Sequence, residues 1–85
     1  MTSKNTDLKI TESLQREIEQ ACKKWSSELN LTRRDEEESI YHSVRADFRQ
    51  RVKYEDRQIL ISDTEAEEII RRIVKKWAYG EGLTY

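Results

Sequence analysis

The sequence contains no proline, and its only two glycines, Gly80 and Gly82, lie near the C-terminal end. Proline and glycine are the residues that most often interrupt a helix, so nothing before Gly80 obliges the chain to leave helical structure. The scarcity of both residues favours an all-α fold.

Cysteine and long apolar runs are equally scarce. Cys22 is the one cysteine among 85 residues, which excludes an intramolecular disulfide and is typical of a reducing compartment. The longest wholly apolar run is Ile59–Ile61, far too short for a membrane span. Residues 1–7 lack the apolar segment of a signal peptide, so we expect a cytoplasmic protein.

An excess of charge of one sign is also missing, with 16 basic and 17 acidic residues and a net charge of −1. A dedicated nucleic-acid binder usually has a clear basic excess, although a local basic face remains open. Charged residues make up 39% of the chain, yet the apolar residues recur at helical spacing, which is typical of a folded protein. At this length, residues 1–85 form a single domain with one core.

Three amphipathic segments follow one another and predict a compact three-helix bundle, with helices over residues 11–29, 33–57 and 63–79. The middle segment is the longest and is expected to extend beyond its two neighbours. The apolar positions of the three segments are Leu14, Ile18, Ala21, Cys22, Trp25 and Leu29; Ile40, Tyr41, Val44, Phe48 and Val52; and Ala66, Ile69, Ile70, Ile73, Val74 and Trp77.

Local signals define the helix ends. Thr11 and Thr32 are expected to cap the first two helices, and Ser62 with Glu65 forms a capping box for the third. Asn30 and Gly80 are suitable terminators. Residues 1–7 and 81–85 are expected to be flexible tails, with docking of residues 81–85 on the bundle as the alternative. Residues 59–61 form either a short extended segment or an apolar plug at one end of the core.

The first and third helices resemble each other, since residues 14–25 align with residues 66–77 and both segments end in the triplet Lys-Lys-Trp. Amphipathic helices of equal length align easily by chance, so a duplication is the less favoured explanation. In either case the apolar residues of the two helices have the same spacing and form similar apolar faces. Parallel packing of these helices would place both tryptophans toward one end of the bundle.

Catalytic and metal-binding patterns are sparse. His42 is the only histidine, and Glu38 precedes it by one helical turn, which predicts an exposed contact and supplies too few ligands for a metal site. Cys22 lies within the apolar stripe and is expected to be a buried structural thiol. The sequence has no phosphate-binding loop and no redox dithiol. We therefore expect no enzymatic activity, no metal and no cofactor.

Basic residues repeat along the predicted middle helix, at Arg45, Arg49 and Lys53, with Tyr54 and Arg57 beside them. Each predicted helix begins with acidic residues and ends with basic ones, which complements the helix dipole and explains most of this pattern without a ligand. The remaining interpretation is an outer basic face that contacts an acidic protein or a phosphate backbone. If the protein has a contact site, these five residues are its candidates.

The sequence thus predicts a small non-enzymatic binding or regulatory protein that acts through protein–protein contacts. Self-association, as a homodimer, is expected because three short amphipathic helices provide a thin core. The alternative is a nucleic-acid-binding regulator that uses the basic face of the middle helix. A helix-turn-helix is disfavoured because the third helix opens with Asp63, Glu65 and Glu67, which would repel phosphate.

Overall fold

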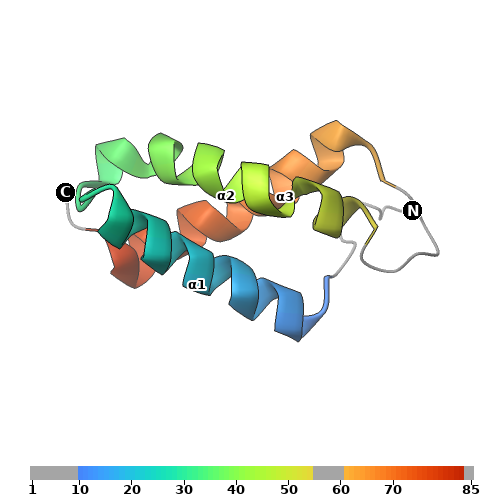
Figure 1. The fold of residues 1–85 in the computed structure, drawn as a ribbon, viewed down its shortest axis with the longest axis horizontal. Helices are drawn as coiled ribbons and strands as arrows, with labels where there is room; N and C mark the ends of the chain where they lie inside the picture. Colours follow the sequence, from blue (N-terminus) through green and yellow to red (C-terminus); the bar gives the residue numbers. More distant parts are fainter. Residues whose placement is uncertain (1–9, 55–60, 84–85) are drawn as a thin grey trace.

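The structure is a computed structural model that describes residues 10–54 and 61–83. Three helices pack against one another, which confirms the all-α three-helix bundle. Helices α1 and α3 run in the same direction, and α2 runs opposite to both (Figure 1). The helical elements are α1 (Glu12–Glu28), the 3-10 turn η2 (Arg34–Glu36), α2 (Glu37–Lys53), α3 (Asp63–Trp77) and the π-helical turn η3 (Ala78–Gly82).

Helix α1 has the predicted caps at both ends. The hydroxyl of Thr11 accepts a hydrogen bond from the backbone N–H of Leu14 at 3.1 Å. At the other end Asn30 adopts a φ of 56°, and the N–H groups of Asn30 and Leu31 donate to the carbonyls of Ser27 and Ser26. This is a Schellman motif with asparagine in the left-handed position that glycine usually occupies.

Helix α2 begins later than predicted. Thr32 does not cap it; instead the 3-10 turn η2 comes first, and the backbone N–H of Arg33 donates to the carboxylate of Glu36 at 3.2 Å. The helix ends at Lys53 with Tyr54 as its C-cap, and the predicted continuation over residues 55–57 lies outside the described residues. Helices α1 and α2 each contain 17 residues, so the described part of α2 is no longer than its neighbour.

Helix α3 begins as predicted and ends differently. Ser62 and Glu65 form the capping box, with reciprocal bonds of 3.1 and 3.2 Å. Gly80 was expected to end the helix in the left-handed conformation, but its φ is not positive, and the chain instead continues through η3. The N–H of Leu83 then donates to the carbonyl of Ala78, and Leu83 is 4% exposed. The chain is therefore docked at Leu83, where a flexible tail was expected; residues 1–7 and 84–85 lie outside the described part.

A single core lies between the three helices. All five predicted apolar positions of α2 are buried in it, together with Leu14, Ile18 and Cys22 of α1. Leu29 is the exception at 42% exposed, because it is the C-cap residue of α1; Leu31, beyond the turn, packs against the core. Ile61 is buried as an apolar plug would be, whereas residues 59–60 are outside the described ranges.

Candidate binding surface

The basic residues of α2 do not form a free outer face. The guanidinium groups of Arg45 and Arg49 both donate to Oε2 of Glu67 on α3, at 3.1 and 3.3 Å. All three side chains are about one-third exposed. The expected outward position of these arginines is therefore wrong: they lie along the contact between α2 and α3.

Lys53, the next basic residue of the series, is also engaged. Its Nζ lies 2.6 Å from Oδ1 of Asp63, and its side chain is only 16% exposed. The hydrogen bond from Lys53 lowers the pKa of the Asp63 carboxyl below its ordinary value. Tyr54 is exposed, with Lys53 near its ring, and Arg57 lies outside the described residues. The four described members of the predicted contact set, Arg45, Arg49, Lys53 and Tyr54, therefore do not form one open patch.

Among the described residues, ion pairs join different helices more often than successive turns of one helix. Arg51 lies one helical turn after Asp47, but its Nη1 lies 2.6 Å from Oε1 of Glu17 on α1, and this hydrogen bond lowers the pKa of Glu17. Asp47 instead accepts from the indole Nε1 of Trp25 at 3.0 Å. The polar side chains of α2 thus hold it to both neighbours.

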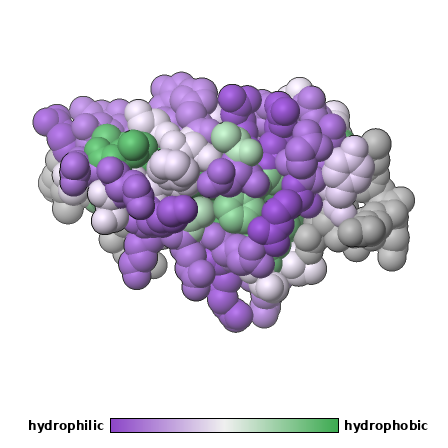
Figure 2. All heavy atoms as spheres, in the orientation of Figure 1, coloured by the Kyte–Doolittle hydropathy of each residue, from purple (hydrophilic) through white to green (hydrophobic). Residues whose placement is uncertain are grey.

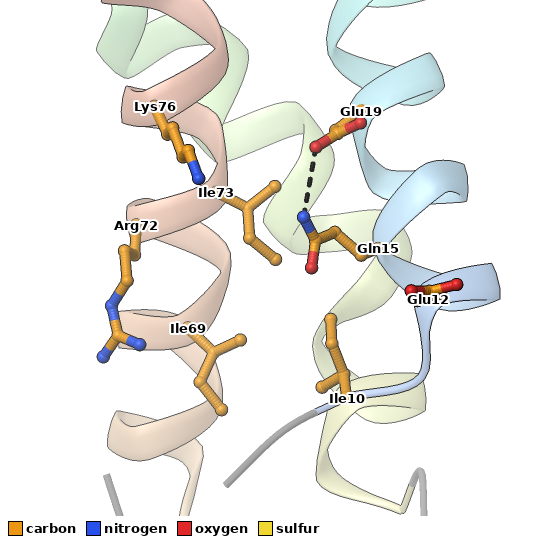
Figure 3. A pocket seen from close by; sticks show the side chains of 8 residues that line it. All are labelled: Ile10, Glu12, Gln15, Glu19, Ile69, Arg72, Ile73 and Lys76. Atoms are coloured by element: carbon orange, nitrogen blue, oxygen red, sulfur yellow. Dashed lines mark hydrogen bonds between the residues drawn. The ribbon is translucent and has the colours of Figure 1, made fainter. Parts of the chain in front are cut away.

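A groove runs between α1 and α3, and sequence analysis did not predict it. It encloses about 380 Å³, and its lining is more apolar than polar. Ile10, Ile69 and Ile73 form its apolar part, with Ile69 8% exposed and the other two partly buried. Figure 3 shows these three side chains directed into the space between the helices. The lining residues are Ile10, Glu12, Gln15, Glu19, Ile69, Arg72, Ile73 and Lys76.

The two walls of this α1–α3 groove carry opposite charges. Helix α1 contributes Glu12 and Glu19, and α3 contributes Arg72 and Lys76 (Figure 3). Glu12 lies 3.9 Å from Arg16 on its own helix, while Glu19 accepts a 3.3 Å hydrogen bond from Gln15. Among the described residues, none of the four charged side chains forms an ion pair across the groove. The groove therefore offers an apolar bottom between an acidic wall and a basic wall.

The face of the molecule on which α1 and α2 lie is different in character. It is mostly hydrophilic, with only small and separate hydrophobic areas (Figure 2). A second hollow on the α1–α2 side has a lining that is more polar than apolar and includes Glu17, Lys24 and Arg51. An extended apolar contact is thus better supported at the α1–α3 groove than on this face.

His42 and Cys22, the residues considered for metal binding and for nucleophilic catalysis, have the surroundings that the sequence predicts. His42 Nε2 is 3.7 Å from Glu38, and both side chains are exposed. Cys22 is fully buried, which raises the pKa of its thiol to about 12, with the nearby charge of Glu19 adding to the rise. A thiol in this setting is a poor nucleophile because the thiolate is the reactive form. The described residues contain no group of three or more His, Cys, Asp or Glu side chains placed to hold a metal ion.

None of the helices within the described ranges is long and apolar enough to cross a membrane. Comparisons with protein-family models, with curated proteins and with solved structures found no match for this chain.

Proposed function

We propose that this chain is a small, non-enzymatic binding protein that acts through protein–protein contacts, and that the α1–α3 groove receives an amphipathic helix. The observation that carries this proposal is the combination of an apolar groove bottom with charged walls that form no pairs across the groove. Elsewhere in the described bundle, ion pairs and hydrogen bonds already occupy many charged side chains that face a neighbouring helix.

A helix is the ligand whose shape suits two parallel helices lying side by side. Amphipathic helices bind such grooves by inserting apolar side chains spaced by three or four residues. The isoleucines of the groove would contact those side chains. Basic residues on one flank of the ligand would meet Glu12 and Glu19, and acidic residues on the other flank would meet Arg72 and Lys76. The ligand we propose is therefore an amphipathic helix with opposite charges on its two flanks.

The alternative of a nucleic-acid-binding regulator has weaker support. It relied on Arg45, Arg49, Lys53 and Arg57, and the first three lie against carboxylates of α3. Phosphate would have to compete with Glu67 and Asp63 for these cations. The acidic wall of the groove would also repel a nucleic-acid backbone.

The proposal predicts selective binding of designed helical peptides, measured by fluorescence anisotropy. A labelled peptide with an apolar face, a glutamate flank and a lysine flank should bind with a Kd of about 10–100 µM. A peptide of the same apolar face with glutamate on both flanks should bind at least about fivefold more weakly, because one flank meets the acidic wall.

Two variants test whether binding occurs in the groove. Arg72→Glu/Lys76→Glu should weaken binding of the mixed-flank peptide, whereas Lys24→Glu/Lys75→Glu, which makes the same charge change outside the groove, should leave it unchanged. Equal binding of both peptides, or equal effects of both variants, would contradict the proposal. A labelled DNA duplex whose binding falls steeply between about 50 and 200 mM salt would support the nucleic-acid alternative instead.

A further inference from the structure

We propose that the partner bound at the α1–α3 groove is a second copy of this chain, which packs its own α1 and α3 against the groove. In the resulting symmetric dimer, α1 of each copy lies over α3 of the other. This inference rests on the proposed function, because it uses the same groove, and it specifies the partner. The charges of the two walls, and the positions of those charges along the groove, fit a second copy.

Two copies that meet face to face across this groove have two simple symmetric arrangements, which differ in the direction of the two-fold axis. With the axis perpendicular to the helices, α1 faces α1 and α3 faces α3. Glu12 and Glu19 would then meet the same carboxylates of the second copy, and Arg72 would meet cations. Like charges placed opposite each other across an interface are unfavourable, so this arrangement is rejected.

With the two-fold axis parallel to the helices, α1 lies over α3 of the second copy. The acidic wall of each copy then meets the basic wall of the other, twice in one interface, as symmetry requires for an isologous contact. The isoleucines of both grooves come together in the middle of the interface, between the two places where an acidic wall meets a basic wall. Only this arrangement uses both walls favourably.

The positions of the charges along the groove fit the same arrangement. Glu19 and Lys76 lie at one level of the groove, and Glu12 and Arg72 lie at another (Figure 3). Rotation about an axis parallel to the helices keeps every residue at its own position along that axis. Glu19 would therefore lie opposite Lys76 of the second copy, and Glu12 opposite Arg72 of the second copy. The match needs no shift of one copy along the other.

The size of the surface indicates a weak dimer. At about 1.5 Å per residue, α1 with 17 residues is about 25 Å long and α3 with 15 residues is about 22 Å long, and side by side they cover on the order of 500 Å². Stable interfaces usually bury about 800 Å² on each partner. We therefore expect a dissociation constant of about 10–100 µM rather than a permanent dimer.

Sedimentation equilibrium over about 5–500 µM protein measures this association directly. The unmodified chain should shift from monomer to dimer across that range. The all-acidic variant, Arg72→Glu/Lys76→Glu, has carboxylates on both walls of the groove, and the all-basic variant, Glu12→Lys/Glu19→Lys, has cations on both. Each variant should raise the Kd at least about tenfold, because like charges then face each other on both sides of the interface. The control Lys24→Glu/Lys75→Glu should associate like the unmodified chain, and circular dichroism of each variant checks that it remains folded.

Mixing the two charge variants tests the arrangement of the helices in the dimer. The all-acidic and all-basic variants, mixed in equal amounts, should form a heterodimer, and the fourfold variant with all four charges inverted should again form a homodimer. A monomer at all concentrations, or a dimer that is unaffected by the groove variants, would overturn this inference. The peptide measurements decide the proposed function separately, since a monomer that still binds the mixed-flank peptide would refute only the dimer.

Discussion

Replacing Ile70 with alanine should lower the free energy of unfolding by about 3 kcal/mol, because it removes three carbons from a side chain in the middle of the core. Ile70 is 0% exposed on α3. A chain of this length has a total stability of about 4–13 kcal/mol, so the loss is a large fraction of it. Urea denaturation followed by circular dichroism at 222 nm measures the change.

Ile73→Ala provides the matched control for this prediction. Ile73 lies one turn further along α3, but it lines the groove and is only partly buried. Its truncation should cost about 1 kcal/mol in the monomer, since part of its side chain already contacts solvent. Equal losses at the two positions would contradict the distinction between the buried core and the open groove.

Reversing the charge of Glu67 should destabilise the fold by about 2 kcal/mol. Glu67 accepts from both Arg45 and Arg49, so Glu67→Lys removes two ion pairs and leaves three cations together between α2 and α3. Each pair is about one-third exposed and is therefore weak by itself. Most of the expected effect comes from the repulsion among three partly desolvated cations, which solvent screens only incompletely.

Glu68→Lys makes the same charge change at the adjacent position, where the side chain is exposed. It should alter the free energy of unfolding by no more than about 0.5 kcal/mol. The two variants are compared by urea denaturation at low and high salt, and added salt should recover part of the stability lost in Glu67→Lys. Indistinguishable stabilities would show that the Glu67 cluster does not hold α2 to α3.

The fold was largely predictable because its signals are local. The stripe from Ile40 to Val52 fixes the buried side of α2, and the capping groups of Thr11 and Ser62 fix where two helices begin. The predictions of helix ends are wrong where tertiary contacts override a local preference of the chain. Gly80 does not end α3 in the left-handed conformation; the chain instead passes through a π-helical turn, beyond which Leu83 is buried in the core.

The candidate surface was much less predictable. Spacing along α2 correctly places Arg45, Arg49 and Lys53 on one side of that helix, but it does not reveal which helix lies beside them. Partners such as Glu67 come from another part of the chain, and their approach depends on how the packed helices are rotated about their axes. The i,i+4 rule offers these three cations no carboxylate within α2, so it cannot identify their partners on α3.

A signal for the groove was present in the sequence, although it was not recognised. The apolar stripe of α3 includes Ile69 and Ile73 as well as the fully buried Ile70 and Val74. It is therefore wider than a contact with α2 alone requires. Arg72 and Lys76 follow the edge formed by Ile69 and Ile73, so that edge is both apolar and basic.

A ¹⁵N NMR dilution series identifies which amides respond to association, and it therefore tests the groove dimer directly. If two copies meet at the α1–α3 groove, concentration-dependent shifts should concentrate at groove residues of α1 and α3, namely Gln15, Glu19, Arg72, Ile73 and Lys76. The amides of Arg45 and Arg49 should change little, because the paired arginines of α2 lie outside the groove. Shifts that concentrate on α2 and leave the groove unchanged would show that the copies do not associate through the groove.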